Sequence, residues 1–252
     1  MNPTAVPVPN TLMPHPMPQR TRIKMCGLTR EADVDAAVAA GADAIGFVMY
    51  EKSPRYVTPE QAKALAQRLP PFVMPVCLFV NAPIQTIRET LATVGPALVQ
   101  LHGDESPEYE AALGLPHLRA ARVPLGLAGQ GFDLLEFAKL HASATGILLD
   151  AMVDGYGGGG KTFDWTAFHW SQLSPSVSSR LVLSGGLTPA NVTDGICQVR
   201  PWAVDVSSGI EQDDADGKPL RGIKDLEKMR HFVQAVREAD ALLNTSVPTH
   251  VA

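Results

Sequence analysis

Residues 22–29 read RIKMCGLT, an apolar strand-like run that ends in Cys26 and is followed by a glycine and a helix-like pattern. Residues 146–150 read GILLD and repeat the arrangement with a carboxylate, Asp150, in place of the thiol. In α/β proteins the carboxyl ends of parallel strands are where catalytic groups gather. Cys26 and Asp150 are therefore a candidate base and a candidate acid at the same edge of one sheet.

Short apolar runs alternate with helix-like segments about eight times along the chain. The runs show little polar alternation, as expected of strands that are buried on both faces. They lie near residues 22–26, 43–49, 74–80, 97–101, 118–123, 146–150, 181–184 and 202–206. Eight strand–helix units predict an α/β fold, an eight-stranded parallel (β/α)₈ TIM barrel. The alternative is a doubly wound open sheet, although the turn after the first strand lacks a dinucleotide-binding glycine pattern.

Cap-then-proline signals mark the expected helix starts. Thr58-Pro59 with Gln61 forms a potential capping box, and Ser106-Pro107 and Thr188-Pro189 repeat the first part of that pattern. After Lys224, apolar residues recur at helical spacing and predict a final helix with one apolar face. These residues are Leu226, Met229, Phe232, Val233 and Val236.

Composition limits the classes of protein to consider. The chain has 252 residues, 45% of them hydrophobic, and a net charge of −5 with no basic run, so nucleic-acid binding is not expected as its main function. Three scattered cysteines predict neither a disulfide framework nor a zinc site. No apolar run reaches the roughly 18 residues of a membrane span, and the first residues do not read as a secretory signal. We expect a cytoplasmic enzyme without a membrane or nucleic-acid partner.

The ends of the chain differ from its middle. The first 20 residues are rich in proline, and we expect residues 1–20 to form a disordered tail. Residues 21–240 are expected to form a single barrel domain, and residues 241–252 a frayed C-terminal tail.

Two small-residue turns follow the last two predicted strands. Ser184-Gly185-Gly186 ends the seventh run, and Ser207-Ser208-Gly209 ends the eighth. Either turn alone is about as often an ordinary tight turn. In barrels, however, the loops after these two strands often bind a phosphate through backbone N–H groups. Together the two turns predict a phosphate site.

Other residues near strand ends are candidates for supporting roles. Lys24 and Cys26 should both face the barrel interior, and closure of the barrel places Asp205 of the eighth strand nearby. We therefore expect a Lys24–Asp205 pair, with structural and electrostatic roles equally open. Arg55 follows the second strand and could present its guanidinium fork to a carboxylate. His102 closes the fourth strand, where a lone histidine is more often structural than catalytic.

Two further features complete the list of candidates. The glycine-rich segment 155–160 after Asp150 is expected to be a flexible loop that approaches the site closely. Cys77, within a predicted strand, and Cys197, on a predicted helix, are expected to be structural.

Together these segments resemble the phosphoribosylanthranilate isomerase family of tryptophan biosynthesis, from about Arg22 to Arg237. The motifs that carry the resemblance are KMCGLT (24–29), GFVMYEKSPRYVT (46–58), LFVN (78–81), VQLHGDE (99–105), LLDA (148–151), GGGGKTFDW (157–165), LSGGLTPANV (183–192) and VDVSSGIE (204–211). Each motif is weak alone, whereas eight in order at predicted strand ends are specific. The resemblance implies a (β/α)₈ barrel that needs no cofactor and no metal.

The resemblance also implies a reaction. It is the Amadori rearrangement of N-(5-phosphoribosyl)anthranilate to 1-(2-carboxyphenylamino)-1-deoxyribulose 5-phosphate. Cys26 would be the general base and Asp150 the general acid. Arg55 would hold the anthranilate carboxylate. Gly185, Gly186, Ser207, Ser208 and Gly209 would hold the phosphate. Lys24, His102 and Asp205 would support the site.

Two alternatives remain open at this point. The chain could be another phosphosugar-binding barrel isomerase, or a barrel that binds a phosphosugar without catalysis, because fold alone does not fix function. The expected partner is a phosphorylated small molecule. We expect a monomer, with a dimer as the alternative.

Overall fold

The computed structural model describes residues 20–126, 131–151, 162, 165, 168, 170 and 180–245. The expected N-terminal tail (apart from residue 20), the glycine-rich loop at 155–160 and residues 246–252 lie outside the described residues.

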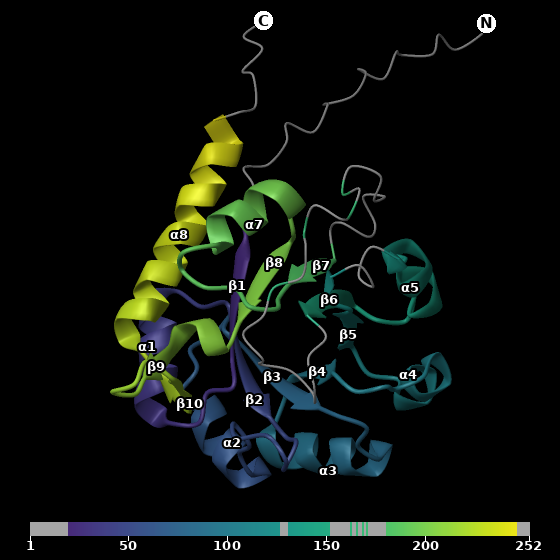
Figure 1. Ribbon diagram of the computed structural model, residues 1–252. Helices are drawn as coiled ribbons and strands as arrows, with labels where there is room; N and C mark the ends of the chain where they lie inside the picture. Colours follow the sequence, from purple (N-terminus) through teal and green to yellow (C-terminus); the bar gives the residue numbers. More distant parts are fainter. Residues whose placement is uncertain are drawn as a thin grey trace, which may run out of the picture.

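Eight parallel strands close into a barrel in the order of the sequence (Figure 1). Barrel closure pairs the first strand with the eighth and places Lys24 beside Asp205 in register. The strands are β1 (Arg22–Cys26), β2 (Ala44–Val48), β3 (Met74–Phe79), β4 (Leu98–Leu101), β5 (His117–Val123), β6 (Gly146–Ala151), β7 (Leu181–Leu183) and β8 (Ala203–Val206). The barrel predicted from the sequence is confirmed, with strand bounds close to the expected ones.

Helices surround the barrel, and a short hairpin lies between the eighth strand and the last helix (Figure 1). The helices are α1 (Glu31–Ala40), α2 (Pro59–Ala66), α3 (Ile84–Val94), α4 (Pro107–Leu113), α5 (Leu134–Leu140), α7 (Val192–Val199) and α8 (Leu226–Thr245). A 3₁₀ turn, η4 (Ser208–Ile210), leads into the hairpin of β9 (Glu211–Asp213) and β10 (Pro219–Lys224). None of the helices in these described ranges is long and apolar enough to cross a membrane.

Two of the three predicted helix starts are confirmed. Thr58 caps α2 with a complete capping box, and the Ser106 hydroxyl accepts from the Tyr109 N–H at the start of α4. The third prediction was wrong, because α7 begins at Val192 and not after Thr188. The side chain of Asn191 accepts from the Thr188 N–H and donates to the Gly186 carbonyl, which holds residues 186–191 as a turn before the helix.

The last helix runs further than the sequence suggested. α8 continues to Thr245, into the segment expected to be frayed. Its Asp240 is buried and accepts hydrogen bonds from the backbone N–H and the hydroxyl of Thr21, which ties the helix to the start of β1. Leu226, expected on the apolar face, is instead 41% exposed, whereas Met229, Phe232 and Val236 are fully buried.

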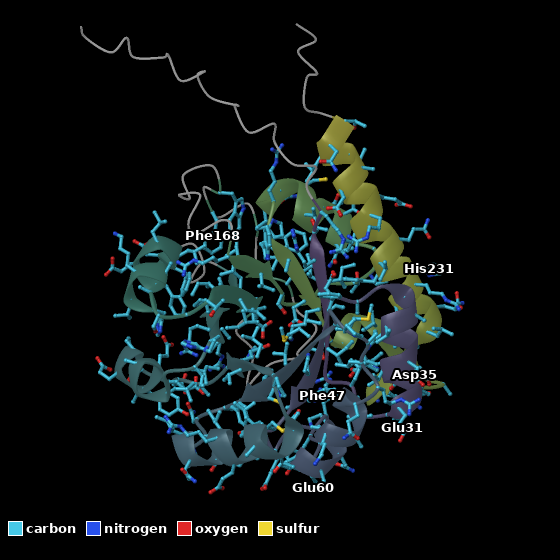
Figure 2. The ribbon with its side chains drawn as sticks, turned by 180° about the vertical axis from the view of Figure 1, so that it is seen from behind. Glu31, Asp35, Phe47, Glu60, Phe168 and His231 are labelled. Carbon is cyan, nitrogen blue, oxygen red and sulfur yellow. The ribbon has the colours of Figure 1, made fainter. Side chains whose placement is uncertain are left out.

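Side chains on the two faces of each strand enter different cores. Ile23, Phe47 and Phe79 point out of the barrel and pack under the helices, in the large core that also contains Phe232. Phe47 lies within the molecule, while charged residues such as Glu31 and Glu60 lie at its edge (Figure 2). This outer core holds the helices on the barrel by burial of apolar area.

The barrel interior is layered. Leu118, Leu148 and Val182 fill its lower part, near the strand starts, in a small apolar cluster. Cys26, Val48, Leu78 and Val80 form a second small cluster at the carboxyl ends. Buried polar side chains also lie on the strands, at Lys24, Gln100, Asp150 and Asp205, and directly after β4, at His102. The packed interior is typical of this fold and makes the mouth the place for chemistry.

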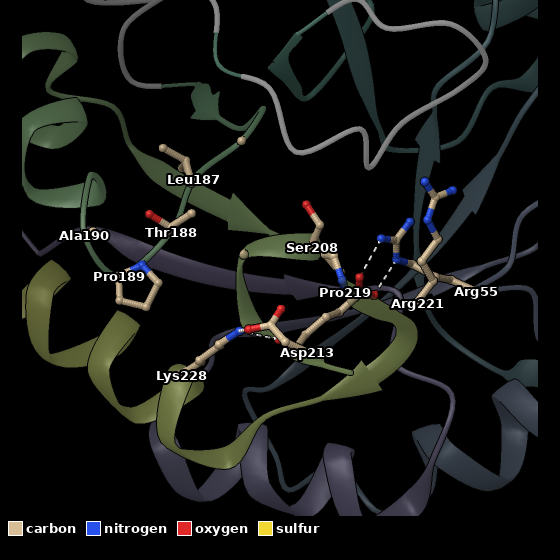
Figure 3. Close-up of a pocket in the computed structure, with 13 residues that line it drawn as sticks. Arg55, Leu187, Thr188, Pro189, Ala190, Ser208, Asp213, Pro219, Arg221 and Lys228 are labelled. Carbon is tan, nitrogen blue, oxygen red and sulfur yellow. Dashed lines mark hydrogen bonds and ion pairs between the residues drawn. The ribbon is translucent and has the colours of Figure 1, made fainter. Parts of the chain in front are cut away.

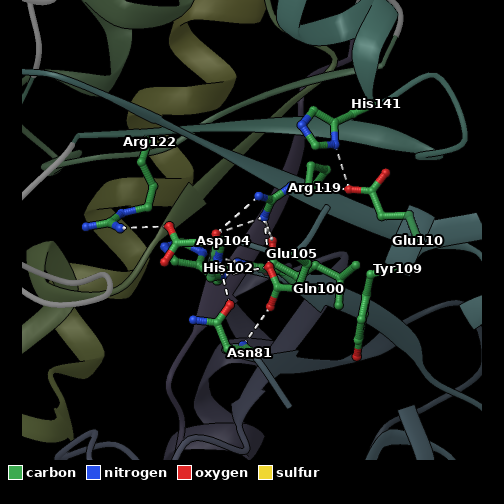
Figure 4. Close-up of polar contacts among 12 residues, drawn as sticks. Asn81, Gln100, His102, Asp104, Glu105, Tyr109, Glu110, Arg119, Arg122 and His141 are labelled. Atoms are coloured by element: carbon green, nitrogen blue, oxygen red, sulfur yellow. Dashed lines mark hydrogen bonds and ion pairs between the residues drawn. The ribbon is translucent and has the colours of Figure 1, made fainter. Parts of the chain in front are cut away.

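Glu110 of α4 is a buried carboxylate that contacts three basic side chains (Figure 4). Its oxygens lie 2.8 Å from His141 Nδ1, 3.2 Å from Arg119 Nε and 3.5 Å from His117 Nε2. Burial by itself would raise the pKa of Glu110, but hydrogen bonds from His117 and His141 lower it to about 2. Burial would also lower the pKa of His117, but the hydrogen bond with Glu110 raises it.

Glu110→Gln should lower the free energy of unfolding by about 3–5 kcal/mol near pH 5.5, because buried cations lose their counter-charge. The contribution of Glu110 is present above its ordinary pKa of 4.5 and is lost as the pH falls toward about 2. The contribution of His117 is complete below 6.5 and is lost as the pH rises through its raised pKa. Urea unfolding at several pH values should therefore show the largest loss of stability between pH 4.5 and pH 6.5, where both contributions are present.

The matched control is Glu136→Gln on α5, whose carboxylate is 71% exposed and lies 3.8 Å from Lys139. It should change the stability by less than about 0.5 kcal/mol at every pH. A loss for Glu110→Gln that is the same at every pH would contradict the prediction.

Candidate active site

Cys26 ends β1 and lies buried at the carboxyl end of the barrel, 5% exposed. Its register neighbour on β2 is Gly46, and a Cβ atom at that position would lie 2.6 Å from the Cys26 sulfur. The glycine therefore leaves the space that the thiol occupies. Gly27, with a φ of 73°, then turns the chain sharply away from the strand.

The expected Lys24–Asp205 pair is confirmed. Lys24 Nζ donates to Asp205 Oδ1 at 2.8 Å, and both side chains are buried. Burial by itself would lower the pKa of Lys24, but the charges of Asp205 and of an ionised Cys26 raise it, so the ammonium stays charged. The pair therefore places a fixed cation inside the barrel, next to the thiol.

The environment of Cys26 acts on its thiol in opposing ways. Burial is the largest effect and raises the pKa, and the charge of Asp205 acts in the same direction. The ammonium of Lys24 lowers the pKa through its charge and a hydrogen bond, without overcoming the effect of burial. The thiol is thus the resting form, and the thiolate is a minor species for which Lys24 supplies the main stabilising charge.

Asp150 lies near the end of β6, three strands from β1 around the barrel, and is 7% exposed. His102 Nε2, just after β4, lies 3.0 Å from Asp150 Oδ2. Behind the histidine, Gln100 Nε2 lies 2.9 Å from His102 Nδ1. His102 is therefore a hydrogen-bond partner of the candidate acid. The supporting role expected for His102 is thus a contact with Asp150.

The loop that carries His102 is held by Glu105 (Figure 4). The two carboxylate oxygens of Glu105 accept from the backbone N–H groups of Asn81 and Gly103, at 2.8 and 2.9 Å. Arg119, on the outer face of β5, donates to Glu105 at 2.9 Å and to the Gly103 carbonyl at 3.1 Å. The buried Arg119–Glu105 pair thus joins the ends of β3, β4 and β5 and fixes the position of His102.

Arg55 is buried and already holds a carboxylate of the protein. Its Nε and Nη2 atoms donate to the two oxygens of Glu211, at 2.7 and 2.8 Å. Within the described ranges, the Nη1 atom of Arg55 makes no such bond to Glu211. The bidentate pair fixes the plane of the guanidinium in one orientation.

Lys224, at the end of β10, is also fully buried beside this pair. Its Nζ donates to the Ser207 carbonyl at 2.9 Å and lies 3.3 Å from Glu211 Oε1. Burial lowers the pKa of Lys224 to about 8, an effect that the charge of Glu211 partly offsets. Lys224 therefore fastens the turn after β8 to the hairpin.

The two predicted phosphate turns lie together at the ends of β7 and β8. Gly185 and Gly186 have φ values of 83° and 65°, which side chains rarely adopt. A Cβ at Gly209 would overlap the carbonyl oxygen of Leu187, so the turns are in direct contact. The Ser207 hydroxyl donates to the Cys26 carbonyl at 3.0 Å and thereby links the second turn to β1.

A cavity of about 540 Å³ opens beside these turns (Figure 3). Backbone of both turns lines it, together with Arg55, Glu211 and Arg221. Its size suits a small molecule, and its walls carry the glycine-rich turns. Cys26 and Asp150 are not among its lining residues, so the cavity lies at the predicted phosphate turns rather than at the candidate acid and base.

Four residues of this arrangement were missed by the sequence analysis: Gly46, Gln100, Glu211 and Lys224. Gln100 lies two residues before His102 on the same strand, and that spacing could have placed it on the inner face. Glu211 and Lys224 act through contacts with residues far away in the sequence, and no local pattern signals them. Among the described residues, no group of three or more His, Cys, Asp or Glu side chains is arranged to hold a metal ion.

Comparison with known proteins agrees with the geometry. The family model of N-(5'phosphoribosyl)anthranilate (PRA) isomerase matches residues 23–235. The N-(5'-phosphoribosyl)anthranilate isomerase of Methylibium petroleiphilum is 57% identical over 228 residues, which cover 90% of this chain and 99% of the relative.

Solved structures show the same likeness. The crystal structure of phosphoribosyl anthranilate isomerase from Thermotoga maritima superposes with a TM-score of 0.72 at 37% identity, covering 86% of this chain and 99% of that one. A second such enzyme, solved in complex with reduced 1-(o-carboxyphenylamino)-1-deoxyribulose 5-phosphate, gives a TM-score of 0.69 at 34% identity, with the same coverage. The resemblance and the isomerase class expected from the sequence are confirmed. Both the family match and these relatives show that the chain belongs to the N-(5'-phosphoribosyl)anthranilate isomerase family.

Proposed function

We propose that the protein converts N-(5-phosphoribosyl)anthranilate into 1-(2-carboxyphenylamino)-1-deoxyribulose 5-phosphate, with Asp150 as general acid and Cys26 as general base. The observation that carries this proposal is the placement of one buried thiol and one buried carboxyl on two non-adjacent strands, β1 and β6, at a single barrel mouth. Each has a polar partner suited to its role: Lys24 beside the thiol and His102 beside the carboxyl.

The chemistry consists of proton transfers. Asp150 gives a proton to the furanose ring oxygen, the bond between C1′ and that oxygen opens, and a protonated imine forms. The protonated imine acidifies the C2′ proton, which the Cys26 thiolate removes to give a neutral enolamine. The enolamine then tautomerises to the ketone. Such acid and base assistance is worth about 10²–10⁴ for each group, and none of the steps uses a cofactor or a metal.

The remaining residues bind the substrate. Backbone N–H groups of Gly185, Gly186 and Ser207–Gly209 hold the phosphate, as turns at these positions of a barrel are suited to do. Arg55 holds the anthranilate carboxylate through Nη1, because Glu211 occupies the other edge of its guanidinium. The substrate then spans the mouth from the turns of β7 and β8 toward the loop after β2.

The cellular setting follows from the same proposal. Three free cysteines support a cytoplasmic location, since oxidising compartments favour paired ones. We propose a monomer, with a dimer as the alternative, since the acid, the base and the phosphate turns all come from one chain and no second copy is needed to complete the site. Size-exclusion chromatography with light scattering would contradict this if the protein eluted as a dimer.

The proposed activity is tested by supplying enzymatically generated phosphoribosylanthranilate and following the loss of its fluorescence. The purified protein should accelerate the decay far above the non-enzymatic rate. Other phosphorylated aminosugars, supplied in parallel, should not be turned over at a comparable rate. No acceleration over the spontaneous decay would overturn the proposal.

Gly46→Ala should lower kcat by about 10²-fold, because a misplacement of about 1 Å at a reacting group costs that much. The added Cβ would lie 2.6 Å from the Cys26 sulfur and 3.1 Å from its Cα atom. The fold should lose only about 1–3 kcal/mol from overpacking. Turnover and urea unfolding would be measured together.

Gly131→Ala is the matched control, since nothing lies within 4 Å of a Cβ at that position. It should leave both quantities near their original values. Normal turnover in Gly46→Ala would show that the position of the thiol is not important.

A further inference from the structure

Three buried polar side chains form a hydrogen-bonded row inside the barrel. Gln100 Nε2 lies 2.9 Å from His102 Nδ1, and His102 Nε2 lies 3.0 Å from Asp150 Oδ2. Gln100 is fully buried and His102 is 4% exposed. The proposed function uses only the last member, Asp150, so the other two require a physical explanation.

When Gln100 Nε2 faces the ring, the chemistry of the amide sets the positions of the protons on His102. An amide nitrogen can only donate, so His102 Nδ1 accepts from Gln100, and a neutral ring carries its proton on Nε2. That N–H group then donates to Asp150. The row as observed therefore fits the state in which Asp150 is a carboxylate and has no proton to give.

The oxygen of Gln100 allows a second arrangement. Gln100 Oε1 is buried and has no hydrogen-bond partner in the described part of the chain. No contact on that side holds the amide in one orientation. If the amide turns by half a revolution, Oε1 accepts from an Nδ1–H group, and His102 Nε2 can accept the proton of an Asp150 carboxyl. Both orientations keep one hydrogen bond between Gln100 and the ring.

We propose that Gln100 and His102 are positioning residues that let Asp150 share one proton with His102 Nε2, with the Gln100 amide turning to suit the protonation state of the ring. We call the state in which the row holds a proton to donate the loaded state. In it, Nδ1–H donates to Gln100 Oε1 and one proton lies between Nε2 and Asp150. Donation to the substrate removes that proton and leaves a neutral ring. Exchange with solvent then moves the ring proton from Nδ1 to Nε2 as the amide turns back, and uptake of one further proton from solvent reloads the row. This inference rests on the proposed role of Asp150 as the acid.

Charged side chains from two neighbouring elements surround the row, and Arg122 of β5 is the register partner of Asp150 on β6. The end of β4 contributes Asp104 and Glu105, and β5 contributes Arg119 and Arg122. Arg119 lies 2.9 Å from Glu105, and Arg122 lies 3.7 Å from Asp104. On the other side, β3 presents the apolar side chains of Leu78 and Val80 and the amide of Asn81, and β6 presents only Asp150.

The row should extend the pH range in which the acid is loaded. An isolated carboxyl loses its proton near pH 4, whereas an imidazole titrates near pH 6.5. The alkaline limb of kcat against pH should therefore depend on His102 and Gln100.

Two variants should shift that limb in opposite directions. His102→Gln removes the basic ring, so the limb should move to lower pH by about one unit or more, with kcat reduced about tenfold and KM within twofold. Gln100→Glu places a carboxylate against Nδ1 and favours the protonated ring, so the limb should move to higher pH. Gln67→Glu, an exposed position at the end of α2, is the matched control and should not move it.

A second measurement does not depend on turnover. The ¹⁵N signals of the His102 ring and the ¹³C signal of the Asp150 carboxyl would be followed against pH in the unmodified protein. Both should change in one common transition, with Nδ1 protonated on its acidic side. The inference would be overturned if the alkaline limb of kcat stayed fixed, or moved in the same direction, in His102→Gln and Gln100→Glu. It would also be overturned if the His102 ring and the Asp150 carboxyl showed separate transitions. Normal turnover in Asp150→Asn would instead overturn the proposed acid, so the two failures are distinguishable.

Discussion

Asp150→Asn should lower kcat by about 10²–10⁴-fold while leaving KM close to its original value. The amide has the size of the carboxyl and can still bond to His102, so the site should keep its shape. It has no acidic proton, and the furanose ring oxygen must then leave without protonation. Steady-state turnover of phosphoribosylanthranilate at several pH values is the measurement.

The pH profile makes this prediction specific. Loss of a general acid should also abolish the alkaline limb of kcat that the acid produces in the unmodified protein. Asp216→Asn, in the exposed turn of the β9–β10 hairpin, is the matched control and should show neither change. Turnover of the Asp150→Asn protein within a factor of a few of normal would remove Asp150 from the role of acid.

The barrel could be predicted from the sequence because each strand carries its own signal. Runs such as residues 146–150 are apolar, short and closed by a polar residue or a glycine, and the observed β6 follows that run closely. The Lys24–Asp205 pair could be predicted although the two residues are 181 apart, because barrel closure and the two-residue period of strands put both inside.

Other parts of the site depend on contacts that leave no local trace. Arg55 and Glu211 are 156 residues apart, and neither lies on a barrel strand, so no register places them together. Lys224 is buried only because the hairpin folds over the turn after β8. The Thr188-Pro189 signal was misleading for a different, local reason: the side chain of Asn191 bonds to Thr188 and Gly186 and holds these residues in a turn before the helix.

The structure also changes the account of the candidate base. A thiol at a strand end suggested a base that needed help toward the thiolate. The observed burial raises the pKa of Cys26 further, in spite of Lys24. For catalysis, Cys26 must then act from its less abundant thiolate form while Asp150 carries the proton that it donates. Activity should consequently rise with pH on the acidic side as the thiolate fraction grows.

Cys26→Ala should lower kcat by about 10²–10⁴-fold, because no other group at the end of β1 can take the C2′ proton. The loss of packing should be small, since the mutation removes one sulfur atom from a cluster of four buried side chains. Turnover and urea unfolding would be compared with Cys77→Ala, a buried thiol of the outer core, which should lose stability but keep its rate.

Lys24→Met removes the charge that stabilises the Cys26 thiolate while leaving the thiol in place. Without the ammonium, the pKa of Cys26 should rise further, and the acidic limb of kcat/KM should move to higher pH by about one unit or more. At sufficiently high pH the variant should recover part of its activity, whereas Cys26→Ala should not recover at any pH. Full activity of Cys26→Ala would remove the thiol from the mechanism, and an unmoved limb in Lys24→Met would show that the thiolate is stabilised by something other than Lys24.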